Sequence, residues 1–284
     1  MSRLTLFRVG VLFLILFFTT TAKAQKEAET FNVDSTLYEY YQRCQEYLLE
    51  PVVLNMSDTL FRMAGERQDE RMQAVAIATQ LDYYYFQGTN EDSVIHYTNK
   101  VKEFAKATHQ PKYYYFAWAN RLITYYLKTS RTNIALYEVQ NMLKEAQEED
   151  DKTGLSRCYN IMSQIYTIKR FDSMAFEWRL KEIELTEKYK IENYNISQTY
   201  AQIANYYINQ KKQKEALAAV EKAIATANSS TQQISAKLEF VNYYSKFGDF
   251  QAAEKLLKEC QAAFEQDKRL ESIKKRLYNI ECLY

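Results

Sequence analysis

Residue types that carry out catalysis occur in this chain, but their spacing does not let them act together. His96 and His109 have no carboxylate pattern around them that indicates a triad or a metal pair. The acidic run at 148–151 is typical of a solvated helix face. The glycines stand singly, so none forms a phosphate-binding loop: Gly10, Gly65, Gly88, Gly154 and Gly248. We therefore expect no enzyme activity, no catalytic residues, no metal site and no cofactor.

Short amide side chains recur at fixed distances from a repeated tyrosine. The positions six and two residues before each tyrosine hold Thr79/Tyr83, Asn120/Thr124, Asn160/Gln164, Ala201/Asn205 and Leu238/Asn242. Amides at helical spacing offer paired donors and acceptors, which suit an extended peptide backbone. The alternative is ordinary polar surface on a helix. We take as candidate peptide-binding residues Asn120, Asn160, Gln164, Asn205, Asn242 and Tyr83.

The repeated tyrosine defines the elements that must position these side chains. It occurs at 85, 126, 166, 207, 244 and 284, a period of about 40 residues. A large apolar residue precedes it by four: Leu81, Leu122, Met162, Ile203, Phe240 and Ile280. A small or β-branched residue follows the first five tyrosines by nine: Val94, Ala135, Ala175, Ala216 and Ala253. Such regularity indicates an internal repeat.

Each repeat reads as a helical hairpin. The segment from Ala216 to Ala227 carries a single apolar stripe, as an outer helix would. The segment from Tyr113 onward is apolar nearly all round, as expected for an inner helix packed on both sides. The chain of 284 residues has only 5 Gly and 2 Pro, which excludes turn-rich sandwiches, barrels and propellers. The fold is predicted to be all-α.

These spacings resemble the tetratricopeptide repeat (TPR). The sequence Gly248-Asp249-Phe250 before Ala253 matches the turn of that repeat closely. The resemblance covers residues from about 70 to 284, with a period of ~40 rather than 34 residues. It implies a right-handed TPR-like α-solenoid of about five to six hairpins, with the amide positions on its concave groove. We place the extra length where one hairpin passes to the next, marked by Pro111, Gly154 and the run at 228–230.

The remaining segments have their own expected roles. Residues 1–24 have basic Arg3 and Arg8, an apolar run shorter than the ~20 residues of a membrane span, and an Ala22-Lys-Ala24 end, which predicts a signal peptide. An uncleaved membrane anchor is the alternative. Residues 25–69 are expected to form an atypical N-terminal hairpin or cap, with one helix around 35–49, an interruption at Pro51 and a second helix from Asp58 to about Arg67. Residues 70–268 are expected to form the TPR-like repeats, and residues 269–284 a half-repeat or capping helix. The protein is expected to be exported to the periplasm of a Gram-negative cell.

Four short strings follow the pattern Asp-Ser/Thr and allow two interpretations. They are typical of helix caps, because Asp and Ser satisfy free backbone N–H groups at a helix start. They are also similar to the O-glycosylation sequon of exported proteins in certain Gram-negative bacteria, and the two interpretations are compatible. The possible modified residues are Ser35, Thr59, Ser93 and Ser173.

The net charge indicates which class of partner is not expected. A value of +1 argues against nucleic-acid binding.

The cysteines and tyrosines are interpreted separately. The 4 cysteines are far apart in the sequence and do not form a disulfide framework, although a Cys260–Cys282 bridge is testable. The 25 tyrosines fill either the core or a binding groove.

Two functions remain open. The first is a freestanding exported module, without catalysis, that captures a protein or peptide in its groove. The expected peptide has no requirement for a terminal carboxylate, because Arg157 is the only cation near the amides. The second is the periplasmic sensor portion of a membrane histidine kinase, a resemblance supported by the tyrosine-rich ~40-residue period and by the end of the sequence at Tyr284 in mid-repeat. Membrane association is expected only if the N-terminal segment is uncleaved or the chain continues beyond 284.

Overall fold

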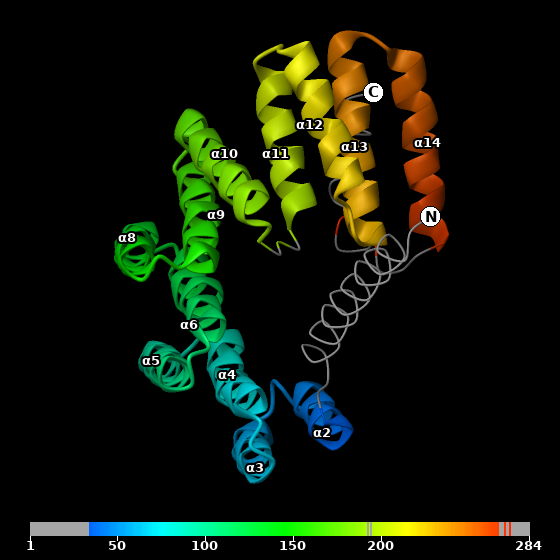
Figure 1. The fold of residues 1–284 in the computed structure, drawn as a ribbon. Coiled ribbons are helices and arrows are strands. Elements are labelled where there is room, and N and C mark those ends of the chain that lie inside the picture. The colour runs from blue at the N-terminus through cyan, green and yellow to red at the C-terminus, as the bar shows by residue number, and fades with distance from the viewer. Residues whose placement is uncertain (1–33, 192, 194, 267–269, 271–272, 274–284) are drawn as a thin grey trace, which may run out of the picture. The chain divides into compact units, whose positions relative to one another are not determined.

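A computed structural model describes residues 34–191, 193, 195–266, 270 and 273, and every regular element in these ranges is helical (Figure 1). The expected signal peptide at 1–24, Cys282, and most of 269–284 lie outside the described residues. No helix among the described residues combines the length and apolar character needed to span a membrane. The chain divides into two units, Met1–Val101 and Lys102–Tyr284, which are described separately.

The first unit contains four helical segments, of which α2, α3 and α4 share an apolar core. It holds α2 (Ser35–Glu46), α3 (Val52–Glu66), α4 (Glu70–Gln87) and most of α5 (Glu91–Ala107). The expectation that the second helix starts at Asp58 is wrong. Pro51 lies at the helix start, where its missing N–H costs nothing, so α3 begins directly after it. The core residues are Leu37, Cys44, Val53, Leu60, Ala64, Met72 and Ala76.

The second unit continues the hairpin pattern after the last turn of α5. One inner helix is built from three consecutive pieces, and inner and outer helices alternate from there, with each outer helix packed on the inner helix before it. The elements are α6 (Pro111–Ala117), the π-helix η1 (Trp118–Ile123), α7 (Thr124–Lys128), α8 (Thr132–Glu148), α9 (Lys152–Ile168), α10 (Asp172–Tyr189), α11 (Ile196–Asn209), α12 (Gln213–Ala225), α13 (Ser230–Phe247) and α14 (Phe250–Gln266).

The small residues of the repeat belong to the core. All five of them are at most 1% exposed, so the position nine residues after the repeated tyrosine is a buried one. Each outer helix can approach its inner helix closely there because the side chain is short or compact. These residues are Val94, Ala135, Ala175, Ala216 and Ala253.

The hairpin turns explain how the chain needs so few glycines. Each turn from an inner to an outer helix contains one residue in the left-handed region, which usually favours glycine. The five left-handed residues are Gly88 (φ 69°), Ser130 (60°), Arg170 (64°), Lys211 (58°) and Gly248 (89°). Only two of these five residues are glycines.

Gly154 has a different role from the one expected, because it does not break the chain between hairpins. It lies inside the first turn of α9, and its N–H donates to the side chain of Asp151 at 2.6 Å. A Cβ atom at this position would lie 2.8 Å from the ring of Tyr115. Glycine is therefore required for the close approach of α9 to α6.

The helix-capping interpretation of the Asp-Ser/Thr strings holds only at Asp34, which accepts from the N–H groups of Thr36 and Leu37. Asp58 lies inside α3, and Asn90 rather than Asp92 caps α5. Asp172 is already the first residue of α10. O-glycosylation at these strings stays a prediction; Ser35 and Ser173 are exposed, and Thr59 and Ser93 are half-buried.

The tyrosine run at 113–115 belongs largely to the core. Tyr114 and Tyr115 are at most 1% exposed, and their hydroxyls donate to Glu145 and Glu149 at 2.9 Å each. Burial raises the pKa of both tyrosines, and the hydrogen-bonded carboxylates add to this effect. These rings therefore hold α6 against α8 and do not line a binding surface.

Candidate functional site

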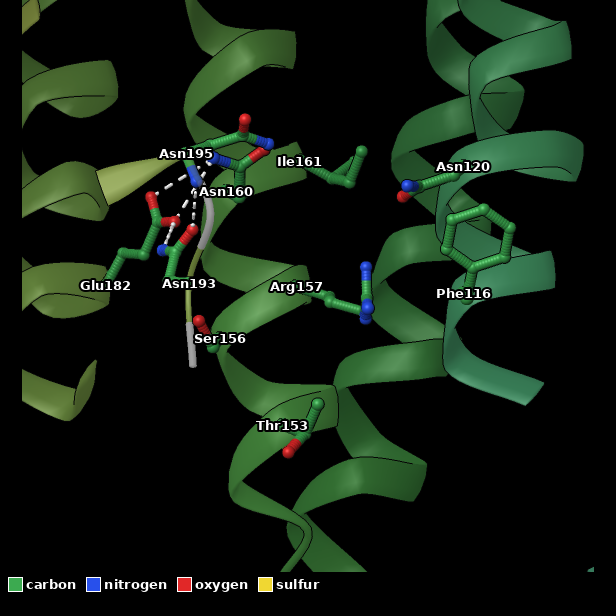
Figure 2. Close-up of a pocket in the computed structure, with 10 residues that line it drawn as sticks. All are labelled: Phe116, Asn120, Thr153, Ser156, Arg157, Asn160, Ile161, Glu182, Asn193 and Asn195. Atoms are coloured by element: carbon green, nitrogen blue, oxygen red, sulfur yellow. Dashed lines mark hydrogen bonds between the residues drawn. The ribbon is translucent and has the colours of Figure 1, made fainter. Parts of the chain in front are cut away.

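A pocket of about 240 Å³ in the second unit brings together side chains from several inner elements. Its walls come from α6, η1, α9, α10 and the segment that precedes α11 (Figure 2). Most of its side chains are polar or charged, which is unusual for a hollow between packed helices. The lining residues are Phe116, Asn120, Thr153, Ser156, Arg157, Asn160, Ile161, Glu182, Asn193 and Asn195.

The π-helix η1 carries Asn120 into the pocket. In η1 the backbone is wound more widely, and the hydroxyl of Thr124 reaches back to the carbonyl of Ala119, five residues earlier, at 2.7 Å. Such single-turn insertions change which side chains face outward and often lie at functional sites. The Asn120 side chain is half-buried and makes no hydrogen bond with any described residue. Its donors and acceptor are therefore free for a ligand.

Arg157 on α9 presents a cation on the same pocket. Its Nε atom is buried and has no hydrogen-bond acceptor among the described residues. The guanidinium carbon lies 5.6 Å from the centre of the Phe116 ring, and Figure 2 shows the side chain between Asn160 and that ring. Burial lowers the pKa of Arg157 and nearby Asp151 opposes the shift, but an arginine stays protonated near neutral pH.

Glu182 on α10 fixes the opposite wall. It is only 2% exposed, and Asn160 Nδ2 donates to both of its carboxylate oxygens at 3.2 Å. Asn193 Nδ2 donates at 2.9 Å, and the Thr199 hydroxyl donates at 3.4 Å. Burial raises the pKa of Glu182, while these hydrogen bonds act against the rise. The carboxylate thus joins α9, α10 and the segment that leads into α11.

This network holds Asn160 in one orientation. Its Nδ2 donates to Glu182, and its Oδ1 accepts from Gln164 Nε2 at 2.7 Å. Gln164 itself is exposed and does not line the pocket. Of the predicted amides, only Asn120 and Asn160 meet in this pocket.

The other candidate residues lie elsewhere. Asn205 lines a second pocket of about 260 Å³ and accepts from Asn209 at 2.9 Å. Asn242 donates to Glu239 at 3.4 Å. Tyr83 belongs to the first unit, where it packs against the core of α2 and α3 and edge-on against Tyr84. At the equivalent position six residues before the tyrosine, Ala201 and Leu238 are buried.

Sequence reasoning did not identify Glu182, Asn193 or Asn195 as parts of this site. One signal was present: Glu182 follows Ala175 by seven residues, so it occupies the buried stripe of α10. A charged residue at a buried position normally has partners that stabilise it. Asn193 and Asn195 lie outside any helix, and no periodicity points to them.

Comparison with known proteins places the fold. No family model and no curated protein matches this sequence. Among solved structures, the apo form of RapI matches with a TM-score of 0.60 and 13% identity, covering 92% of this chain and 72% of RapI. A signal transduction ATPase from Pyrococcus horikoshii with a tetratricopeptide repeat sensor matches with a TM-score of 0.57 and 16% identity, over 87% of this chain and 39% of that protein. The fold is a TPR-like helical solenoid.

A third TPR-like neighbour extends the comparison. The apo form of the quorum sensor NprR from B. thuringiensis matches with a TM-score of 0.54 and 13% identity, covering 95% of this chain and 76% of NprR. At such identities these neighbours establish the fold of this chain and neither its role nor its ligand. Among the described residues, no cluster of three potential metal ligands is present.

Proposed function

We propose that this chain is a non-enzymatic TPR-like module that captures an extended segment of a peptide or protein in the pocket between η1 and α9. One observation supports this most: Asn120 and Arg157 line the pocket, and neither side chain has a hydrogen-bond partner among the described residues. Buried polar groups normally have a partner, so a ligand would complete these two.

The size of the pocket favours a peptide over a small organic ligand. Its volume of about 240 Å³ is below the range of roughly 300–1,000 Å³ typical of small-molecule sites. It suits one or two side chains of a peptide whose backbone continues along the surface. Amide side chains beside it can pair with backbone N–H and C=O groups. The fold neighbours include a quorum sensor and a tetratricopeptide repeat sensor, which is consistent with recognition.

We also propose export to the periplasm, which rests on the residue pattern of 1–24. The alternative is that the same pocket serves the periplasmic sensor portion of a histidine kinase. Its support is the tyrosine-rich period and the sensor functions in the names of two fold neighbours. Reading the genomic DNA downstream separates the two, since a frame that continues into a long apolar segment and a kinase core defeats the freestanding module.

A peptide-display selection tests the proposed function. The chain is immobilised, random peptides are selected on it, and their affinities are measured for wild type, Asn120→Ala and Gln140→Ala. Asn120→Ala should weaken binding by about 1 kcal/mol, because it removes hydrogen bonds to the peptide without breaking one inside the protein. Gln140→Ala removes an exposed amide from the outer helix α8 and should leave the affinity unchanged. Equal losses in both variants, or no selected peptide at all, would contradict the proposal.

A further inference from the structure

We infer that Arg157 is a carboxylate-binding site, so that the captured peptide carries an acidic side chain or a free C-terminus into this pocket. This inference rests on the proposed function and specifies its ligand. It also changes the ligand expected from the sequence, where a lone cation gave no reason to require a carboxylate.

The charge of Arg157 is not balanced by a neighbouring carboxylate in the part of the chain that the structure describes. No carboxylate among the described residues forms an ion pair or hydrogen bond with its guanidinium. The oxygens of Glu182, the acid that also lines the pocket, already accept from Asn160, Asn193 and Thr199. Asp151, whose charge acts on Arg157, already accepts from the N–H of Gly154 at 2.6 Å. The pocket therefore contains a cation that no described carboxylate neutralises.

The guanidinium of Arg157 has a shape that suits a carboxylate. A guanidinium presents its N–H groups as a planar fork that matches the two oxygens of a carboxylate. At Arg157 the Phe116 ring lies beside this fork, at 5.6 Å from the guanidinium carbon, and restricts its position. Nε itself is buried, and the terminal N–H groups of the guanidinium have no acceptor among the described residues. A carboxylate that accepts from these terminal groups would gain charge-assisted hydrogen bonds at the pocket wall.

Other polar side chains surround the place where a carboxylate would bind to Arg157. Asn120 and Asn160 lie on either side of Arg157 along the pocket, as Figure 2 shows. The amide of Asn120 is free to pair with the peptide backbone next to the acidic group, and Asn160 Oδ1, which accepts one hydrogen bond from Gln164, can accept a second. The hydroxyls of Thr153 and Ser156 line the same pocket and add further donors. A neutral ligand would use the amides but leave the charge of the Arg157 guanidinium without a counter-charge.

A positional library of acetylated octapeptides with amidated C-termini provides the test, together with the same peptides carrying a free C-terminus. Affinities are measured by fluorescence polarisation for wild type, Arg157→Gln, Arg157→Lys and the control Arg170→Gln, which removes the same charge from an exposed turn. Wild type should select Asp or Glu at one position, or the free C-terminus, and the two peptide sets tell these sources apart. Arg157→Gln should bind the selected peptide at least roughly tenfold more weakly, Arg157→Lys should be intermediate, and Arg170→Gln unchanged.

A double-mutant cycle makes the result specific. Replacing the selected Asp by Asn, or amidating the selected C-terminus, should weaken binding to wild type but cause little further loss in Arg157→Gln. The peptide substitution on wild type keeps the test valid even if Arg157→Gln folds poorly. Peptide binding without any acidic preference, or an equal loss in both backgrounds, would overturn this inference and leave the proposed function intact. Failure of every peptide to bind wild type would overturn both.

Discussion

At the scale of single residues, the buried carboxylate of Glu182 links the pocket to the packing of the second unit. It accepts hydrogen bonds from α9, from the segment before α11 and from α11 itself. A carboxylate that is only 2% exposed is costly to keep ionised, and these hydrogen bonds together with the charge of Arg179 offset part of that cost. Asn160 therefore serves two purposes, because it both lines the pocket and compensates Glu182.

The burial of Glu182 predicts a pH dependence of stability. Its pKa is raised above 4.5 in the folded protein, so between 4.5 and that raised pKa the folded state holds more protons than the unfolded state. Stability from this group is therefore full at lower pH and is lost as the pH rises through the folded pKa. The measurement is the difference in the free energy of unfolding between wild type and Glu182→Gln, which should fall as the pH rises above 4.5 and then level off.

An exposed glutamate supplies the control for this pH series. Lys258 lowers the pKa of Glu254 below 4.5, so the contribution of Glu254 is present above that value and is lost as the pH falls. The difference in the free energy of unfolding between wild type and Glu254→Gln should therefore fall as the pH is lowered, and this change should occur only at acidic pH. If the difference in the free energy of unfolding between wild type and Glu182→Gln does not change with pH, burial does not raise the pKa of Glu182 and the prediction is wrong.

Truncation of Asn160 is expected to affect both folding and binding. Asn160→Ala leaves Glu182 with fewer donors and should lower the free energy of unfolding by about 1–3 kcal/mol. The Asn120 side chain makes no hydrogen bond with a described residue, so Asn120→Ala should change the free energy of unfolding by less than about 0.5 kcal/mol. Denaturant melts of the two variants make the comparison. Equal stability of both variants would show that Asn160 does not support Glu182.

The sequence predicted part of this site. The offset from the tyrosine placed Asn120 and Asn160 at one pocket, because it reflects the helical period. The same offset did not identify pocket residues at Ala201 and Leu238, because the side chains at these two positions are buried. It also missed Glu182 and Asn193, because a contact between an outer helix and a loop follows from tertiary packing and not from periodicity along one helix.

At the scale of elements, close approach between helices determines which residue types are tolerated. Tyr115 is fully buried and presses on the first turn of α9 at Gly154. The sequence showed Gly154 as a glycine between two helical patterns, and a breaker is the usual interpretation. Only the position of the Tyr115 ring shows that the missing Cβ is the reason for this glycine. Similarly, Pro51 marked a break correctly, but α3 uses it as a helix start.

A pair of alanine substitutions tests this reason for Gly154. Gly154→Ala should destabilise the protein by roughly 1–3 kcal/mol, although alanine favours helices, because the buried Tyr115 ring has no free space to move into. Gly65→Ala in α3 is the matched control, since its new Cβ would meet only the end of the flexible Gln73 side chain. That control should be neutral or stabilising by up to about 1 kcal/mol in thermal melts. A Gly154→Ala protein as stable as wild type would contradict the packing argument.

At the scale of the whole molecule, the repeat was the most reliable signal in the sequence. The spacing of large, tyrosine and small positions reflects the fixed geometry of a helical hairpin, so it survives although no family model matches. It predicted the helices of the second unit and the buried small residues that join them. Sequence alone did not show η1, because a π-helix depends on local packing and has no distinct residue pattern.

Nuclear magnetic resonance can show whether a peptide occupies the pocket between η1 and α9. The observed signals are the side-chain amide of Asn120 and the Nε–H of Arg157, during titration with the best peptide from the display selection. Both signals should shift in proportion to binding, and the amide of Gln140 on the outer helix α8 should not. Shifts confined to the second pocket, at Asn205 and Asn209, with Asn120 and Arg157 unchanged would contradict peptide binding in the pocket between η1 and α9.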